Sequence, residues 1–546
     1  MNASPLIAVG FLSALASGQQ WQVAPLVLEG DTVFGGHAVL RVNNVAINNN
    51  MDWRAEVTTA NGLGPDTMVG PNGAVAQESM PLLFPNGATL RSFDSIQLNS
   101  AGHMSMNVFL NNTSGTGDDS AVYYDLTMLV QEGQFVQAEP FDPLTYYRTF
   151  YDTKIDDNGN VLLLCAVDDP TILSTVDYAV MYLQTDTFGD LVSELVIAME
   201  GDPVGQTGGL ITILRTGPHS YDLSDKGSIV FSADTDLPTT MDGVVILNDE
   251  IIAQEGTPSP VEGRNWSVLS SAEVSINNSD DWVVSATING SSSSNLLIAR
   301  NGQKFVQEGD PVPGIPQYTL TTFGSGPVDI ADTGEVLWYG DWNDPNTQVD
   351  TGLFVDDQLI VQEGVSMVDG VIIDTLIGAT DGYAFSDDGR FVIFEAILQN
   401  GVDGAFVATC KGQVTSIPGC NPDGSSLTVV GGSPSLGETL ELRLNSPSPA
   451  TGLRFLAIAG VHVVDGSGCG VDLPGIGEVL IGFTPPNPFT LPAGTHTGGP
   501  GLISLEIPNN PALVGMPRFL QAYYLFPSDP TNLFDLTNAL EVTLGA

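Results

Sequence analysis

The sequence predicts an all-β protein, and three features of its composition and patterning lead to that fold class. The 546 residues include 61 Gly and 35 Pro, which disfavour helix interiors and favour turns. Long stretches rich in Ala, Glu, Lys and Leu, the residues of extended helices, are absent. Short apolar runs instead alternate with clusters of Asn, Asp, Ser and Gly, which is the pattern of strands joined by tight turns.

A short apolar run that ends in Glu, usually followed by Gly, recurs along the chain. Its seven glutamates are Glu29, Glu78, Glu132, Glu200, Glu255, Glu308 and Glu363. Successive copies lie 49, 54, 68, 55, 53 and 55 residues apart, so one structural unit is repeated seven times. Because the glutamates are equivalent, we expect them to do the same structural task in each unit, such as accepting backbone hydrogen bonds at a strand end. A cation-binding ring of carboxylates and an acid/base pair are the alternatives.

A second repeated pattern lies between the glutamates: an apolar residue, a turn of Asn, Asp, Ser and Gly, and a further apolar run. The apolar residues that precede the turns are Ile47, Leu98, Ile155, Leu223, Ile276, Ile330 and Phe385. Asn and Asp tolerate left-handed backbone angles and Gly adopts them without strain, so each turn predicts a tight hairpin. Both patterns lengthen in the third unit, which predicts an insertion between Asp168 and Leu191.

Each unit contains about four strands in about 50 residues, which is the size of a propeller blade. A sandwich or a solenoid is the alternative for short strands joined by turns. We therefore predict a seven-bladed β-propeller over residues 21–417. The isolated strand Leu26–Glu29 can join a late unit, which would close the ring and leave no free sheet edge.

The repeat stops near Cys420, and residues 421–546 have a different composition. Alternating strands such as Leu440–Leu444 and Leu502–Ile507 are broken there by clusters of Pro and Gly. This alternation predicts a C-terminal antiparallel β-sandwich of about eight strands.

The turn-plus-strand pattern resembles the NxxGxxxF tandem repeat of bacterial surface and secreted proteins. The matching residues are Asn99, Gly102 and Met106, then Ser224, Gly227 and Phe231, then Ala331, Gly334 and Trp338. Phe385–Phe394 also resembles the strand-turn-strand of Tol-type and WD-repeat propellers. Gly is missing at Met51 and Asp280. The resemblance covers residues 21–417, implies an extracellular setting and brings no catalytic residues.

The C-terminal region resembles a module of planctomycete-type secreted proteins. The matching segments are Pro434–Gly437, Ile507–Pro508 and Leu513–Gly515. The resemblance leaves attachment, glycan binding and a structural cap as alternative roles for this module.

The N-terminus predicts export. Leu6–Ala16 is an apolar stretch that ends in Ala14-Leu15-Ala16, a cleavage pattern for a signal peptide over residues 1–16. The stretch is too short to span a bilayer; an ordinary first strand is the alternative, because Met1–Pro5 contains no Lys or Arg. We expect a secreted or cell-surface protein with no integral membrane segment.

The formal net charge of −49, from 15 Lys and Arg against 64 Asp and Glu, repels phosphate backbones and anionic membranes. Nucleic acids are therefore excluded as partners, and such a charge also favours a soluble monomer. Cys165 lies in an apolar run and is expected to be an inert buried thiol. In an oxidising compartment we expect one disulfide among Cys410, Cys420 and Cys469, with its pairing open.

The sequence predicts no catalytic or metal site. His37, His103, His219, His462 and His496 show no metal-ligand spacing, and HExxH, GxSxG and P-loop motifs are absent. Asp156–Gly159 and Ser386–Gly389 carry the oxygen ligands that calcium favours, but they are interpreted as plain turns. Trp53, Trp282 and Trp338 are expected in the core, whereas Trp266 and Trp342 are the candidate surface aromatics.

We therefore expect an extracellular, non-catalytic binding or adhesion scaffold that recognises a protein or a polysaccharide without a cofactor. A secreted propeller hydrolase or lyase acting on glycans is the first alternative, and a structural cell-envelope protein is the second. Different acidic residues in different units lining one funnel would favour the enzyme. Equivalent residues in every unit would favour the scaffold.

Overall fold

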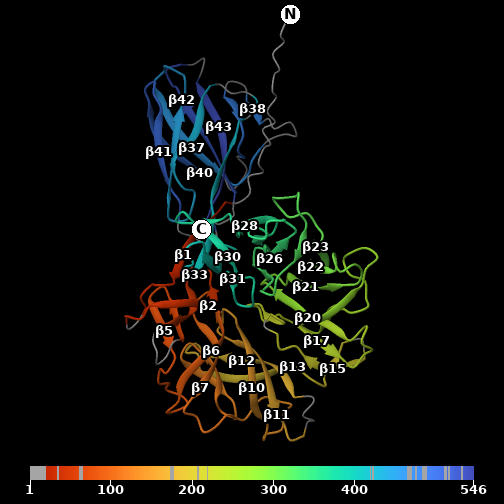
Figure 1. Cartoon of the computed structure of the whole chain (residues 1–546). Helices are drawn as coiled ribbons and strands as arrows, with labels where there is room; N and C mark the ends of the chain where they lie inside the picture. Colours follow the sequence, from red (N-terminus) through yellow and green to blue (C-terminus); the bar gives the residue numbers. More distant parts are fainter. Residues whose placement is uncertain are drawn as a thin grey trace, which may run out of the picture. The chain divides into compact units, whose positions relative to one another are not determined.

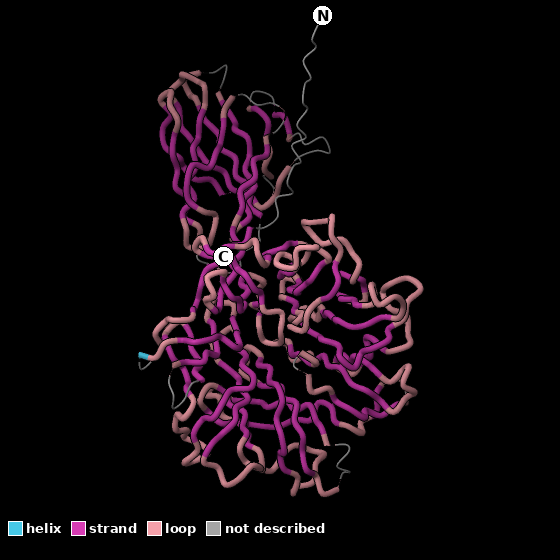
Figure 2. Tube along the Cα trace, viewed as in Figure 1, coloured by secondary structure: helices cyan, strands magenta, loops and turns pink. Residues whose placement is uncertain are grey.

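In the computed structural model, residues 20–545 are described except for 34–35, 61–65, 172–176, 206–207, 218, 419, 421–423, 464–469, 474–475, 483–488, 509–512, 514–516 and 530–532. The described residues contain strands and loops and no α-helix, so the all-β prediction is confirmed (Figure 2). No helix in this part of the chain has the length and hydropathy needed to cross a membrane. The proposed signal peptide, residues 1–16, lies outside the described residues.

The chain divides into two compact units, and the larger one spans Val23–Thr409. Its strands form antiparallel sheets that follow one another along the chain. Sheet 1 contains β2 (Val39–Ile47), β3 (Trp53–Thr59), β4 (Asp66–Gly70) and β5 (Gly73–Gln77). Sheet 2 contains β6 (Thr89–Leu98), β7 (Met104–Asn111), β8 (Ser120–Tyr124) and β9 (Thr127–Gln131). Sheet 3 contains β10 (Tyr146–Ile155), β11 (Val161–Asp168), β12 (Tyr178–Thr185) and β13 (Leu191–Met199).

The next sheets keep this order, but in several of them the first strand is interrupted. Sheet 4 contains β14 (Pro203–Val204), β15 (Gly209–Leu214), β16 (Tyr221–Leu223), β17 (Ile229–Thr235), β18 (Gly243–Leu247) and β19 (Glu250–Gln254). Sheet 5 contains β20 (Trp266–Ile276), β21 (Trp282–Ile288), β22 (Leu296–Arg300) and β23 (Gln303–Gln307). Sheet 6 contains β24 (Leu320–Thr322), β25 (Asp329–Ile330), β26 (Val336–Trp342), β27 (Thr351–Val355) and β28 (Gln358–Gln362).

Sheet 7 combines the end of the repeat region with the start of the chain. It contains β29 (Met367–Val368), β30 (Val371–Leu376), β31 (Tyr383–Phe385), β32 (Phe391–Leu398), β33 (Asp403–Lys411) and β1 (Gln20–Leu28). Strand β1 pairs with β33, so the N-terminal strand completes the last sheet. The expected joining of Leu26–Glu29 to a late unit is confirmed.

The sheets of this unit are arranged around a common centre in a propeller-like way. Figure 1 shows them succeeding one another in chain order, from red through green to cyan. The first strands of neighbouring sheets contact each other in the cyclic order β2, β6, β10, β16, β20, β25, β31 and back to β2. The described residues of this unit therefore form a closed circle of sheets.

Apolar residues on both faces of each sheet pack between neighbouring sheets. In β11, Leu162 and Leu164 pack with sheet 4, whereas Leu163 and Cys165 pack with sheet 2. Because successive side chains of a strand point to opposite faces, a strand buried on both faces becomes a continuous apolar run. This arrangement explains the sequence Val161–Val167 and places the thiol of Cys165 where it is fully buried, as expected.

The expected insertion in the third unit is a longer outer hairpin. Strands β12 and β13 contain 8 and 9 residues, whereas the corresponding strands β4 and β5 contain 5 each. The additional length therefore lies in both strands of this hairpin and in the turn between them, residues 186–190, and it extends beyond the predicted bound of Leu191 because β13 continues to Met199.

The smaller unit contains the C-terminal residues from Cys410 onward. Its five-stranded sheet has the order β34 (Gln413–Ile417), β43 (Phe534–Thr543), β42 (Pro517–Leu525), β37 (Gly452–Ala459) and β40 (Phe489–His496). A three-stranded sheet contains β35 (Ser426–Gly432), β36 (Thr439–Asn445) and β41 (Gly501–Glu506), and a short pair contains β38 (Val471–Leu473) and β39 (Gly477–Val479). Strand β34, which the sequence prediction includes in the repeat region, thus pairs with β43.

The two larger sheets of this unit share one hydrophobic core. Leu440 and Leu442 from β36 pack in the same cluster as Leu520 from β42 and Leu540 from β43. Cys420 in this region is disulfide-bonded, while Cys165 and Cys410 carry thiols. Cys469 lies outside the described residues. The expectation of one disulfide among the three late cysteines is therefore confirmed at Cys420.

Candidate functional site

The turns that follow the first strand of each sheet are hydrogen-bonded to one another around the ring. Asn48 Nδ2 donates to Asn99 O at 2.8 Å, and Asn99 Nδ2 donates to Asp156 O at 3.0 Å. Asp157 N donates to Asp225 Oδ1 at 2.6 Å, and Asn278 Nδ2 donates to Asp225 Oδ2 at the same distance.

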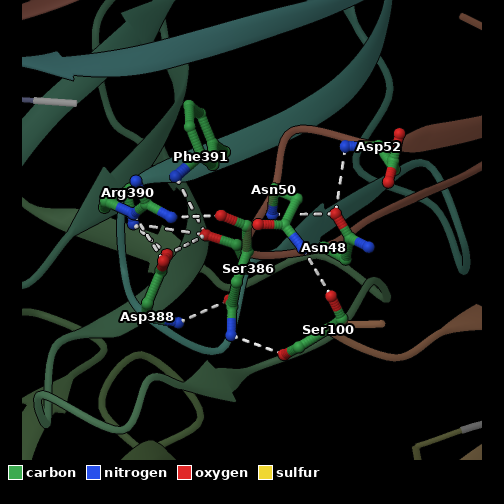
Figure 3. A network of polar contacts seen from close by, with 9 residues as sticks. Asn48, Asn50, Asp52, Ser100, Ser386, Asp388, Arg390 and Phe391 are labelled. Atoms are coloured by element: carbon green, nitrogen blue, oxygen red, sulfur yellow. Dashed lines mark hydrogen bonds and ion pairs between the residues drawn. The ribbon is translucent and has the colours of Figure 1, made fainter. Parts of the chain in front are cut away.

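The same pattern continues through the last three turns and returns to the first. Asn277 Nδ2 donates to Ala331 O at 2.8 Å, and Asp332 N donates to Asp387 O at 2.5 Å. Asp388 N then donates to Asn49 Oδ1 at 2.9 Å, which joins the seventh turn to the first. Figure 3 shows this closing part of the network, in which Arg390 also donates to the backbone of Asn49. The turns therefore form a closed hydrogen-bonded circuit, which explains why the repeats favour Asn, Asp and Ser there.

The repeated glutamates lie away from this circuit, at the outer ends of the sheets, where they contact backbone groups. Glu200 Oε1 accepts a hydrogen bond from Leu214 N at 3.2 Å, and Glu255 Oε1 accepts one from Leu269 N at 2.8 Å. Glu363 Oε2 contacts Leu376 N at 3.4 Å. Each of these glutamates connects one sheet to the first strands of the next, which agrees with the structural role expected from their equivalence.

A cavity of about 110 Å³ lies where the first strands of the sheets meet. Every sheet of the larger unit contributes to the lining of this cavity. In each sheet, one lining residue lies two positions before the first residue of the turn that follows. These residues are Ala46, Gln97, Lys154, Asp222, Ser275, Asp329 and Ala384. The residue that follows each of them is apolar in every repeat. The position two before the turn therefore varies between repeats, while the apolar residue that follows it also lines the cavity in every repeat.

Lys154 is the cation of this cavity, and it is surrounded by carboxyl groups. Burial lowers the pKa of its ammonium, but Asp152, Asp222, Asp329 and Asp381 outweigh that effect and raise the pKa. Among the described residues, no carboxylate forms a direct ion pair with Lys154. Lys154 is half-buried and lines the cavity.

Ser275 joins two of the cavity carboxyl groups. Its Oγ lies 2.8 Å from Asp222 Oδ2 and 2.8 Å from Asp329 Oδ1. A hydroxyl has one proton to donate, so a proton on one of the two carboxyl groups would supply the second hydrogen bond. Burial and the charge of Asp222 raise the pKa of Asp329 to about 6, which brings this protonation closer to neutral pH.

Two further groups line the cavity. Burial and then Asp152 raise the pKa of Asp381 to about 7. His219 Nε2 lies 3.7 Å from Asp381 Oδ1. Burial and the nearby Lys154 hold the pKa of His219 well below its usual range, so the imidazole is neutral. The cavity thus contains carboxyl groups of unequal acidity beside one ammonium and one neutral imidazole.

The structure corrects one sequence expectation and adds residues that the expectation missed. Trp266 and Trp342, the candidate surface aromatics, are 4% and 2% exposed and belong to the cores beside sheets 5 and 6, so that prediction is wrong. Trp53 and Trp338 are buried as expected, and Trp282 is half-buried. In the described part of the chain, no three His, Cys, Asp or Glu side chains form a group that could hold a metal ion.

No protein-family model and no curated protein matches the chain. Similar solved structures include PorZ, a surface component of the type-IX secretion system of Porphyromonas gingivalis, with 9% identity over 93% of this chain and a TM-score of 0.27. The chain spans about half of PorZ, 52% of its length.

Two further similar structures are a gluconolactonase and a sialidase. The gluconolactonase, from Xanthomonas campestris, has 10% identity over 71% of this chain and 97% of its own, with a TM-score of 0.25. Trypanosoma rangeli sialidase in complex with sialic acid has 10% identity over 97% and 95% of the two chains, with a TM-score of 0.30. TM-scores this low carry no argument about this chain.

Proposed function

We propose that this chain is an extracellular, non-catalytic binding or adhesion protein, built from a seven-bladed β-propeller and a C-terminal antiparallel β-sandwich. The cyclic contacts between successive sheets and the pairing of β1 with β33 support the propeller. The core that the two C-terminal sheets share supports the sandwich. We also propose membership of the bacterial surface tandem-repeat proteins with a planctomycete-type C-terminal module.

One observation carries the binding function. The residue two positions before each turn faces the central cavity, yet it is Lys154 in one repeat, Asp222 in the next and Ser275 in the one after. Residues that only support a repeated fold tend to be alike in every repeat, as the turn residues and the glutamates are. A ligand-binding site needs lining side chains that suit the ligand, held in place by a constant scaffold. Variable lining residues on repeated turns and glutamates meet this requirement.

An extracellular location has independent support. Cys420 is disulfide-bonded, and disulfides persist mainly in oxidising compartments. N-terminal sequencing of the protein recovered from the culture medium or cell surface tests this part of the proposal. Cleavage after Ala16 is expected, and an intact N-terminus retained in the cytoplasm would contradict export.

The binding experiment is an array of proteins and polysaccharides probed with the full-length protein, with and without calcium. Asp387→Asn changes an exposed side chain at the turn end of the cavity, and Asp249→Asn makes the same change in an outer hairpin turn. We expect selective binding that Asp387→Asn weakens and Asp249→Asn leaves unchanged. Absence of binding combined with cleavage of a polysaccharide would overturn the proposal.

A glycan hydrolase or lyase is the second candidate, because the cavity contains different acidic residues from different sheets. Asp329 and Asp381 have raised pKa values of about 6 and about 7, and a general acid needs a raised pKa near the operating pH. Release of reducing ends from polysaccharides, abolished in Asp381→Asn and retained in Asp249→Asn, would favour this candidate over the binding protein.

A further inference from the structure

Two residues that line the central cavity each have a buried polar atom without a hydrogen-bond partner among the described residues. The two atoms are Tyr383 Oη and His219 Nε2, and their residues are 1% and 6% exposed. A buried polar group without a partner destabilises the folded state. The phenol oxygen of Tyr383 can accept a hydrogen bond, and Nε2 of the neutral His219 accepts one when the ring proton is on Nδ1.

The cavity also has more carboxyl groups than cations. Asp222, Asp329 and Asp381 line it, and Asp152 acts on the same Lys154. These carboxyl groups belong to sheets 3, 4, 6 and 7, so they approach the cavity from different directions. One ammonium cannot compensate several separated carboxylates at once. A second positive charge would stabilise the site.

The turn end of the cavity is also acidic. Asp225, Asp332 and Asp387 line that end, and burial and the nearby Asp225 raise the pKa of Asp387 well above its usual range. A cleft lined by one sign of charge concentrates ligands of the opposite sign. A cation would therefore be attracted toward the inner wall, and an anion would be repelled.

The size of the cavity limits the ligand. One water needs about 10–15 Å³ of such space, so a cavity of about 110 Å³ holds at most roughly seven to eleven waters or a ligand with no more heavy atoms than that. This range fits a small aliphatic diamine. A polysaccharide chain is too large to enter a cavity of this volume.

We propose that the central cavity binds one small organic diamine. Its ammonium groups donate hydrogen bonds to Tyr383 Oη, His219 Nε2 and the carboxyl groups of Asp329 and Asp381, while Lys154 stays in place. Two separated ammonium groups match carboxyl groups that approach from different sheets. This inference goes beyond the function proposed above, since the diamine site requires no macromolecular ligand.

The test is isothermal titration calorimetry of the full-length protein with 1,4-diaminobutane at two salt concentrations. The neutral analogue 1,4-butanediol and calcium chloride serve as comparison ligands. We expect saturable binding with one diamine per chain and an affinity at least about tenfold higher than that of the diol, because only the diamine supplies charge-assisted hydrogen bonds.

Three variants separate the cavity from the general surface charge. Tyr383→Phe removes the unpartnered hydroxyl, so we expect about three- to tenfold weaker diamine binding with an unchanged or higher melting temperature. Asp381→Asn should weaken binding further, and Asp249→Asn, in an outer hairpin turn, should not.

Several results would overturn the proposal. Equal binding of the diol, or diamine affinity unchanged in both Tyr383→Phe and Asp381→Asn, would exclude the assigned contacts. Several weak diamine sites per chain would indicate binding to the acidic surface only, if Asp249→Asn lowers the diamine affinity as much as the cavity variants do and salt abolishes the binding. Saturable calcium binding without diamine binding would assign the cavity to a metal ion instead.

Discussion

Asp388 and Asn49 are 339 residues apart in the sequence, and the backbone N–H of Asp388 donates a hydrogen bond to Oδ1 of Asn49 at 2.9 Å. Nδ2 of the same Asn49 lies 2.7 Å from Ser100 Oγ in the next turn. One side chain therefore connects the turns of sheets 7, 1 and 2, at the point where the circle of sheets closes.

Replacing this side chain should weaken the closure. We expect Asn49→Ala to reduce the free energy of unfolding by about 1–3 kcal/mol, because it leaves both partners without their contact. Urea denaturation measures the change. Lys226→Ala, in the exposed part of the fourth turn, is the matched control, and equal effects of the two substitutions would contradict a role in closure.

Two turns adopt a left-handed backbone without glycine. Met51 and Asp280 have φ angles of 60° and 62°, at the position where Gly227 has 83°. This conformation costs a non-glycine residue about 1–2 kcal/mol, so Met51→Gly should stabilise the protein by about 1 kcal/mol. Gly227→Ala should destabilise it by a similar amount, although a Cβ there would meet no atom within 4 Å. Chemical denaturation of both variants checks the pair, and effects of the same sign would contradict this explanation.

The repeated glutamates should contribute to stability through backbone contacts. Glu255→Ala removes the acceptor of the buried Leu269 N–H, and we expect a loss of about 1–3 kcal/mol. Glu250 lies at the exposed start of β19, the strand that Glu255 directly follows. Glu250→Ala should change the free energy of unfolding by less than about 0.5 kcal/mol. Comparable losses in thermal or urea denaturation would show that the contact of Glu255 has no special role.

The cavity carboxyl groups should make stability depend on pH. In an unfolded chain an aspartate titrates near pH 4, whereas burial raises the pKa of Asp329 to about 6 and that of Asp381 to about 7 in the folded protein. The folded state therefore binds these protons more tightly, so their contribution decreases the free energy of unfolding as pH rises from about 4 to about 7. Urea denaturation at pH 5, 6 and 7 should show this decrease, and Asp381→Asn should reduce its slope. An unchanged slope in that variant would contradict the assignment.

The repeat, the turns and the role of the glutamates could be predicted from the sequence because each follows from a pattern that recurs at a fixed spacing. Asn48 and Asn99 occupy equivalent positions, and both donate to the backbone of the next turn. Local turn chemistry and the period thus contain most of the information about the larger unit.

The cavity residues could not be predicted in the same way, because their position is the one that varies between repeats. Lys154, Asp222 and Asp329 become comparable only after the repeats are aligned on their turns. The available signal was their fixed spacing from the turn, since each of them lies two positions before the first turn residue.

The error at Trp266 and Trp342 has a related cause. Both residues have polar neighbours in the sequence, but Trp266 begins β20 and Trp342 ends β26. The ring of Trp342 packs against Phe354 with centroids 6.2 Å apart. Phe354 belongs to β27, the neighbouring strand of the same sheet. Side chains of neighbouring strands can bury a strand end, and the polarity of the next residues in the chain does not report this contact.

The central claim is that strand β1 closes the circle of sheets, and paired truncations test it most directly. Removing residues 1–19 leaves β1 intact, whereas removing residues 1–28 deletes it and exposes the edge of β33. The account predicts an unchanged melting temperature for the first truncation and a large decrease for the second, partly reversed by adding a peptide of residues 20–28. Equal melting temperatures for the two truncated proteins would contradict it.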